Sequence, residues 1–389
     1  MTTTSLLDLR KFLAPESVFG GGAATLAGRY VQNLGARRAL LVTDPGVLAL
    51  SWFPGIMQSI CDAGVEAVLF SDIHPNPRDH EVMLGAERYR ENACDAIVAV
   101  GGGSPMDCAK GIGIVVTNDR NVLDFEGVDN VAHPGPPLIC IPTTAGSSAD
   151  VSQFAIINDT SRKVKIAIVS KAMVPDVALI DPLLTLTMPP GLTANTGVDA
   201  LTHAIEAYVS NAHGPTTDLF ALDAIRRISQ CLPQAIDCPE DAEARAGMML
   251  GSMYAGLAFS NAILGAVHAM AHSLGGLMDL PHGQCNALLL DHVIAYNFDA
   301  APDRYADIAR AMGAELAPTA NHEEKRDAVL SRVRALKHAV GVTGGLGSLG
   351  VTEADIDGLV NFALHDPCMV TNPKAPTAGD IRAVYQNAL

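Results

Sequence analysis

Short apolar runs recur along the first half of the chain, and segments of helical character separate them. These runs cover residues 39–42, 65–70, 96–100 and 138–141. Continuous runs of Val, Ile and Leu that alternate with helices predict a parallel sheet covered on both faces. Two later runs, 154–159 and 164–170, predict a hairpin or an edge pair, and residues 177–182 end the β-rich half.

The pattern changes after Pro189 and Pro190. From there the chain is rich in Ala and Leu at helical spacing and has few β-branched runs. We therefore expect two domains, an α/β domain over residues 1–189 and an all-helical domain over residues 190–389.

The stretch 246–278 has no charged residue and is long enough to cross a bilayer, but it is rich in Ala and Gly and holds Ser, Asn and His. It predicts one or two buried helices of a soluble domain.

Composition narrows the class of partner and the compartment. The chain of 389 residues has a formal net charge of -16 and no run of Lys or Arg, which argues against nucleic acid or an anionic membrane as its partner. Its 8 cysteines are scattered without a C-x-x-C pair, which favours free thiols in a reducing compartment such as the cytoplasm. The opening MTTTSLLDLRKF lacks the long apolar core of a signal peptide.

Ligand-type side chains recur at helical spacing in the second half. His268 and His272 are four residues apart, His282 follows where the chain is expected to leave that helix and turn, and Asp199 and His203 form a second pair four apart. A carboxylate with imidazoles suits Fe(II), Zn(II) or a similar ion rather than calcium. The alternative is that these are ordinary buried histidines, and the spacing does not tell which histidines would be ligands.

A glycine loop, residues 101–104, directly follows a predicted strand and precedes a predicted helix. Backbone amides at a helix N-terminus bind phosphate, and glycine allows the anion to approach closely. The run GGGSPMD matches neither standard nucleotide fingerprint, so a structural turn remains an alternative.

Asp44 ends the first strand, where a carboxylate can bind ribose hydroxyls and repel a 2′-phosphate, although an Asp-Pro-Gly turn is also common.

Taken together, these segments resemble the iron-containing (group III) alcohol dehydrogenase family along nearly the whole chain. The motifs that carry the resemblance are VTDPG, PNP, GGGSPMDCAK, IPTTAG, VALIDP, TGVDALTHAIEAY, the stretch from His268 to His282, and TNPK. The resemblance implies a Rossmann-like, dinucleotide-binding N-terminal domain and a helical metal-binding C-terminal domain, which is a dehydroquinate synthase-like architecture. It also implies a homo-oligomer, a dimer or larger.

The resemblance assigns roles to individual residues. It implies that one metal ion is held by Asp199, His203, His268 and His282, and that His272 lies near the nicotinamide. Because imidazole titrates near the working pH, His272 is then the candidate catalytic proton relay. The cofactor-binding residues that the resemblance implies are Asp44, Asn76, Gly102, Gly103, Ser104, Asp107, Thr143, Thr144, Ser147 and Lys165. The substrate-pocket positions that it implies are Ser152, Ile156, Phe259 and Cys368.

The expected function is metal-dependent hydride transfer between NAD and a small neutral alcohol or aldehyde, with a primary alcohol favoured as the substrate and Fe(II) favoured over Zn(II). A neutral substrate is expected because an anionic substrate beside the metal would normally bind an Arg or a Lys, and no Lys or Arg lies between Arg245 and Arg304. The chain reads TTAGSSADVS where many family members read TTAGTGSEVT, so Asp150 replaces a Glu in the segment that the resemblance places between cofactor and substrate. Alternatives are a glycerol dehydrogenase-like polyol oxidoreductase, a dehydroquinate synthase-like lyase, a metal-free maleylacetate reductase-like enzyme, or a non-catalytic regulatory relative.

Overall fold

The structure is a computed structural model that describes residues 9–389, and the chain forms two compact units. The α/β unit comprises Leu13–Thr187, and the helical unit comprises Met188–Leu389 together with residues 9–12. The expectation that the chain carries no signal peptide concerns its first residues, of which 1–8 lie outside the described part.

The α/β unit is built on a parallel sheet, which confirms the predicted fold class. Within the described residues this sheet has 6 strands in the order β1-β9-β6-β4-β2-β3, and every neighbouring pair is parallel. The strands are β1 (Glu16–Phe19), β9 (Val177–Ile180), β6 (Leu138–Pro142), β4 (Ala96–Gly101), β2 (Arg38–Val42) and β3 (Glu66–Phe70). The sequence pattern did not predict β1, which is short and only half-buried.

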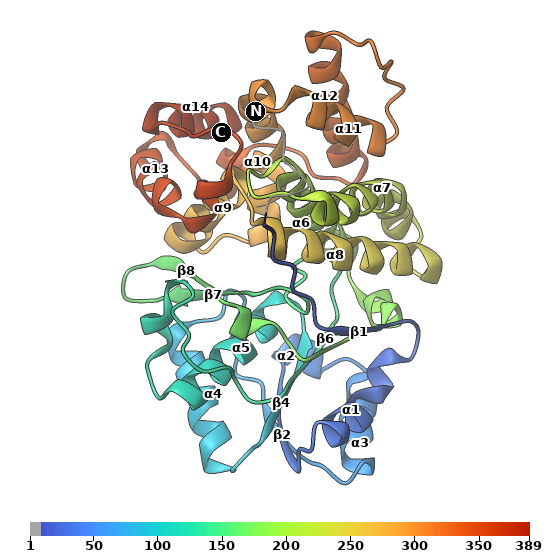
Figure 1. Ribbon diagram of the computed structural model, residues 1–389, viewed down its shortest axis with the longest axis vertical. Coiled ribbons are helices and arrows are strands. Elements are labelled where there is room, and N and C mark those ends of the chain that lie inside the picture. The colour runs from blue at the N-terminus through green and yellow to red at the C-terminus, as the bar shows by residue number, and fades with distance from the viewer. Residues whose placement is uncertain (1–8) are drawn as a thin grey trace. The chain divides into compact units, whose positions relative to one another are not determined.

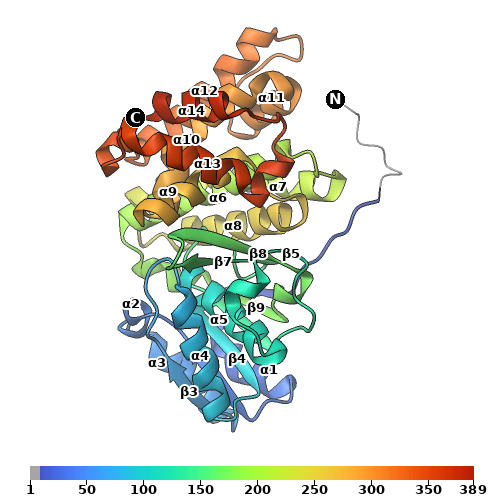
Figure 2. The ribbon, with the colours of Figure 1, turned by 90° about the vertical axis from the view of Figure 1, so that its left-hand side faces the viewer.

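Alternate residues of the strands face opposite sides of the sheet, and each side has its own helices. Leu40 and Val42 pack in one apolar cluster with α4 (Asp79–Glu91) and α5 (Gly103–Asn118). Ala39 and Leu41 pack in the other with α1 (Ala27–Asn33) and α3 (Phe53–Asp62). Figure 2 shows α4 and α5 side by side along the sheet. Both faces of β2 are therefore buried, as a continuous apolar run predicts.

A smaller sheet stands beside the first one in the same unit. Its strands β7 (Phe154–Asp159) and β8 (Val164–Val169) form the predicted antiparallel hairpin, and β5 (Gly127–Val128), which was not predicted, pairs with β8. The buried ammonium of Lys110 in α5 donates to the backbone oxygens of Ser152 and Phe154 at 2.8 Å each. These bonds fasten the start of the hairpin to α5.

The second unit is helical, as predicted, and its long helices α6, α7 and α8 pack on one another (Figure 1). The helices are α6 (Pro190–Val209), α7 (Pro215–Asp237), α8 (Ala242–Ala262), α9 (Ala266–Met278), α10 (His282–Asn297), α11 (Pro302–Ala311), α12 (His322–Ala339), α13 (Ile356–His365) and α14 (Ala378–Ala388). One local expectation is wrong. His282 does not lie in a turn after a helix, because it is the first residue of α10.

The uncharged stretch 246–278 spans two helices, which agrees with the expectation of one or two. Between them Ile263 adopts φ 61°, a left-handed conformation that is unfavourable for a β-branched side chain. No single helix of residues 9–389 is long and apolar enough to cross a membrane. The pair α8 and α9 meets the length and composition limits only together, and it is bent by 98°.

Candidate metal centre and cofactor-binding loop

Three helices of the helical unit bring the candidate metal ligands together. Asp199 lies on α6, His268 lies on α9, and His282 begins α10. Each offers a donor atom, and the three atoms lie within 4.8 Å of one another. The Nε2 atoms of His268 and His282 are 3.7 Å and 3.8 Å from the same oxygen, Asp199 Oδ1. Asp199 and His268 are buried, whereas His282 is partly exposed.

The other two histidines pack against this group. The ring of His203 stacks on that of His268 with centroids 4.5 Å apart, and on that of Phe259 at 4.3 Å. The ring of His272 stacks on that of His282 at 5.3 Å. Neither His203 nor His272 belongs to the set of three donors within 4.8 Å. The ligand role of His203 and the non-ligand role of His272 therefore stay predictions.

The electrostatics of the site favour a cation. Burial by itself would raise the pKa of Asp199, but the three surrounding histidines outweigh burial and hold its pKa well below the usual range. Burial would lower the pKa of His268, but hydrogen bonds and charge from Asp199 and Glu206 raise it. An ionised carboxylate and two imidazoles are donors that suit Fe(II) or Zn(II). The residues present thus fit a divalent metal ion.

Glu206 is a buried residue of the site that the sequence reasoning missed. Its carboxylate accepts hydrogen bonds from His268 Nδ1 at 2.6 Å, from Val267 N at 2.7 Å and from Gly265 N at 3.1 Å. It therefore orients His268 so that Nε2 faces the other donors, and it caps the N-terminus of α9. A signal was present in the sequence, because Glu206 follows Asp199 by two helical turns on one face of α6.

Asp366 is a second missed residue, and it holds His272. Its Oδ2 lies 2.8 Å from His272 Nδ1, and its Oδ1 accepts a bond from Cys368 N at 2.8 Å. Burial raises the pKa of the Cys368 thiol well above its usual value, so Cys368 is a neutral thiol. Donor atoms of His272, Asp366 and Cys368 lie within 4.8 Å of one another. Because these groups already bond to each other, we assign them as a hydrogen-bonded network rather than as a second metal site.

The glycine loop of the α/β unit has the form of an anion site. Gly101 ends β4 with φ 153°, and Gly103 begins α5. A β-carbon at Gly102 would lie 3.2 Å from Thr144 Oγ1, and one at Gly103 would lie 3.1 Å from Ser147 Cβ. The side chains of Thr144 and Ser147 thus pack directly on the loop. A helix N-terminus behind glycines fits a pyrophosphate group.

Other predicted cofactor residues meet beside this loop. Ser104 Oγ accepts a hydrogen bond from Asn76 N at 3.3 Å, and Lys165 Nζ donates to Asn76 Oδ1 at 2.7 Å. Asn76 has φ 58°, which Asn tolerates better than most residues. Thr143 is buried, and its backbone N–H bonds to Gly101 O at 3.0 Å. These contacts connect α5, the PNP loop and the hairpin.

Asp107 and Asp150 lie buried in the same unit. Burial raises the pKa of each to about 6, although the Lys110 ammonium opposes the rise in both. Asp107 Oδ2 accepts a bond from Ile156 N at 3.2 Å, and Ser152 Oγ lies 3.3 Å from Lys110 Nζ. The hydroxyl of Ser152, a predicted pocket residue, is thus engaged in the interior of the α/β unit.

Asp44 has a local role besides the predicted one. Instead of a simple turn, Asp44 caps a one-turn helix, α2 (Pro45–Leu48), and its Oδ1 accepts a bond from Val47 N at 2.9 Å. The N-cap explains the Asp-Pro-Gly sequence without any ligand. Contact with a ribose stays a prediction.

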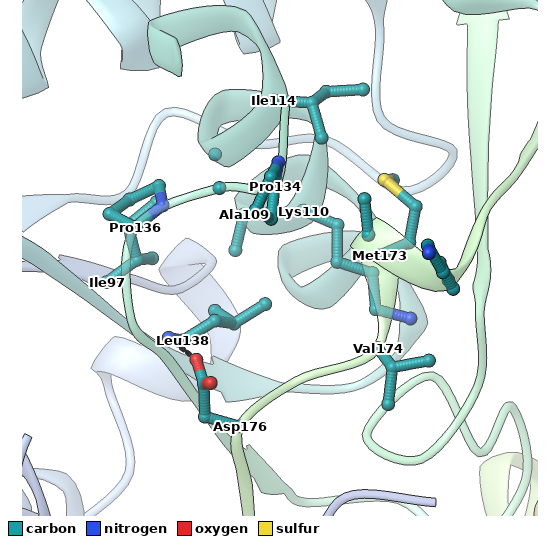
Figure 3. A pocket seen from close by; sticks show the side chains of 14 residues that line it. Ile97, Ala109, Lys110, Ile114, Pro134, Pro136, Leu138, Met173, Val174 and Asp176 are labelled. Atoms are coloured by element: carbon teal, nitrogen blue, oxygen red, sulfur yellow. Dashed lines mark hydrogen bonds between the residues drawn. The ribbon is translucent and has the colours of Figure 1, made fainter. Parts of the chain in front are cut away.

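A cavity of about 230 Å³ lies elsewhere in the α/β unit (Figure 3). Its walls come from α5, from residues 134–136 and from the segment Lys171–Met173, and none of the predicted site residues lines it. The carboxylate of Asp176 at its edge accepts a bond from Leu138 N at 2.8 Å, drawn as a dashed line. Lys110, which also lines it, has its ammonium bonded to backbone oxygens, so we assign the cavity no ligand.

Comparison with known protein families decides which family the chain belongs to. Residues 14–182 match the family model described as iron-containing alcohol dehydrogenase, and residues 193–389 match the C-terminal model of the same family. The chain belongs to the iron-containing alcohol dehydrogenase family. The family explains why the glycine loop and the histidine cluster occur in one chain, and it confirms the predicted resemblance.

Relatives within the iron-containing alcohol dehydrogenase family match over nearly the whole chain. The 1,3-propanediol dehydrogenase of Klebsiella pneumoniae is 42% identical over 97% of this chain and 98% of its own length. The NAD-dependent methanol dehydrogenase of Bacillus methanolicus is 38% identical over 97% and 99%. A crystal structure of 1,3-propanediol oxidoreductase superposes with a TM-score of 0.95 at 40% identity, covering 98% of this chain and 100% of that one. The prediction of a metal-dependent alcohol dehydrogenase is thereby confirmed at the level of the family.

Proposed function

We propose that this alcohol dehydrogenase transfers hydride from a small uncharged primary alcohol to NAD at a divalent metal centre, and reduces the aldehyde in the reverse direction. The observation that carries the proposal is the convergence of donor atoms from Asp199, His268 and His282 within 4.8 Å, with Glu206 bonded behind His268. An ion held there would act as a Lewis acid on the alcohol oxygen.

His272 is the proposed proton relay of the reaction. Its Nδ1 lies 2.8 Å from Asp366 Oδ2, so the carboxylate keeps a proton on Nδ1 and leaves the lone pair on Nε2. An imidazole in this tautomer can accept the alcohol proton at Nε2 and pass it on. The hydride is accepted by the nicotinamide ring of the cofactor.

The metal proposal assigns four ligands, Asp199, His203, His268 and His282, and favours Fe(II) over Zn(II). His282→Ala should lose bound metal and turnover together, whereas His272→Ala should keep its metal and lose rate. His322→Ala is the matched control, because His322 is an exposed histidine of the same unit whose ring meets that of Phe298 edge to face and which is outside the donor group. Metal content is measured by elemental analysis after anaerobic loading. Stoichiometric metal in the His282→Ala protein would refute the assignment.

The cofactor proposal is NAD rather than NADP. Support comes from the glycine loop at the start of α5 and from Asp44 at the end of β2. Asp44→Asn removes the charge that would repel a 2′-phosphate and still caps α2, so the local structure is retained. We expect the variant to prefer NAD over NADP less strongly than the wild type does, mainly because its kcat/KM with NADP is higher. A wild-type enzyme that uses both cofactors equally would contradict this role of Asp44.

The substrate proposal is a small neutral alcohol or short diol. Phe259 and Cys368 are uncharged and buried, and the relatives named above act on 1,3-propanediol and methanol. A matched panel sets ethanol, 1-propanol, 1-butanol and 1,2-propanediol against lactate, 4-hydroxybutyrate and glycerol phosphate. The expected order of kcat/KM puts every anion below the best neutral alcohol. An anion that exceeds all the neutral alcohols would overturn the proposal.

Two further expectations stay predictions. The first is a homo-oligomer of two or more chains, which sedimentation equilibrium would test. The second is a cytoplasmic location, which fits the scattered free cysteines and which cell fractionation would test.

A further inference from the structure

Asn286 lies one turn after His282 on α10 and is fully buried. Its amide nitrogen Nδ2 is 2.6 Å from Asp199 Oδ1 and 3.1 Å from each of the Nε2 atoms of His268 and His282. These are the same three atoms that form the candidate metal donor set. One amide nitrogen therefore contacts every member of that set.

The chemistry of the neighbours determines which end of the amide faces them. The carboxylate of Asp199 is ionised and can only accept, so the atom 2.6 Å from its Oδ1 must be a donor. His268 Nδ1 lies 2.6 Å from Glu206, so Nε2 is the nitrogen of that ring that faces the amide. The amide therefore directs its N–H groups at the donor atoms.

This arrangement is costly for the amide itself. Across residues 9–389, Oδ1 of Asn286 is among the few buried side-chain nitrogen and oxygen atoms that have no hydrogen-bond partner. A buried acceptor without a partner is unfavourable, and an apolar side chain of the same size would avoid the cost. Packing therefore does not explain the amide, whereas its contacts with three ligand atoms do.

We propose that Asn286 is a positioning residue of the metal centre, whose amide keeps the donor atoms of Asp199, His268 and His282 turned toward one another. The role rests on the proposed metal site. Each of the three side chains has several rotamers, and ordering them costs conformational entropy. An ion that binds takes these donor atoms over from the amide, but it meets side chains that the amide has already ordered, so less ordering is left to oppose binding and the ion is bound more tightly.

The test measures the affinity for Co(II), whose visible absorption reports the geometry of its ligands, by competition with a chelator. Two variants remove the amide in different ways. Asn286→Ala leaves space, and Asn286→Leu fills the space with an apolar group of similar size. Leu288→Ala is the control, because Leu288 is a buried residue of the same helix outside the donor set.

We expect both Asn286 variants to bind Co(II) about 10- to 100-fold more weakly than wild type, which is the usual cost of losing a residue that orients metal ligands, and to change the visible spectrum of the bound ion. The control should melt at a lower temperature yet keep its affinity. Affinities of both variants within threefold of wild type would overturn the proposal. So would weak binding by Asn286→Ala alone, because that result would mean that the side chain only fills space. A wild-type protein that binds no Co(II) would overturn the metal centre itself and this role with it.

Discussion

We expect the position and stability of helix α9, which carries His268, to depend most on its hydrogen bonds to the Glu206 carboxylate. Glu206→Gln keeps the shape of the side chain and removes its charge. In the wild type one carboxylate oxygen accepts hydrogen bonds from Gly265 N and His268 Nδ1, and the other accepts from Val267 N. Glutamine has only one acceptor oxygen. If that oxygen accepts the first two bonds, the NH₂ group of the glutamine must face the N–H of Val267.

The magnitude follows from these three bonds. A buried donor left without an acceptor costs about 1–3 kcal/mol, and bonds to a charged group are roughly twice as strong as neutral ones. We therefore expect Glu206→Gln to lower the free energy of unfolding by about 2–4 kcal/mol. Weaker orientation of His268 should also weaken metal binding by about 10- to 100-fold. Because a bound ion stabilises only the folded state, the loss should be larger with metal than without it.

The assay is urea denaturation of the metal-free and Zn(II)-loaded proteins, with the zinc affinity measured by chelator competition. Glu315→Gln is the control, since Glu315 is an exposed glutamate of the same unit and should change the unfolding free energy by less than about 0.5 kcal/mol. If Glu206→Gln matched this control in both stability and zinc affinity, the charge of Glu206 would not be what holds α9 and orients His268.

Three further predictions follow from particular contacts. Gly283→Ala should cost about 1–3 kcal/mol in urea denaturation and weaken metal binding, because its β-carbon would lie 2.7 Å from Asn195 O and force α10 away from α6; unchanged metal affinity would contradict this. Asp366→Asn should keep its metal by elemental analysis yet lower kcat at least about tenfold, since His272 would lose the tautomer set by the carboxylate; an unchanged kcat would refute the relay. Burial raises the pKa of Asp291, but two basic side chains of α12 outweigh it and lower the pKa below the usual value. Its charge therefore stabilises the fold above about pH 4, and the stability gap between wild type and Asp291→Asn should shrink as the pH falls below that value; a gap that widens in acid would show the reverse sign.

Much of the α/β unit follows from local pattern. The apolar runs of β2, β3, β4 and β6 predict buried parallel strands because both faces of each are covered, and the structure has these strands within one residue of the predicted ends. The glycine loop lies at the junction of β4 and α5, where a strand meets a helix N-terminus. A residue-by-residue pattern is sufficient here because burial and helix initiation are properties of neighbouring residues.

The spacing of donors on α6 was also readable from the sequence. Asp199, His203 and Glu206 recur at one and two helical turns, so they share a face of any helix that forms there. The sequence alone did not reveal that Glu206 bonds to His268, because its partner lies 62 positions away along the chain. His282 was expected in a turn, since Pro281 and Gly283 flank it. In the structure it is the first residue of α10, and Gly283 beside it packs closely on Asn195 of α6.

The N-terminus of α9 shows what only the tertiary structure decided. Its N-cap residue, Gly265, has no side chain to cap the helix, so no local signal marks this end. Glu206 from α6 accepts from Val267 N, and Asn372 from the C-terminal segment accepts from Ala266 N at 3.1 Å. Sequence periodicity reports which residues share a helix face, because that depends on positions three and four apart. It cannot report which distant carboxylate or amide satisfies a helix end, because that depends on how separate helices pack.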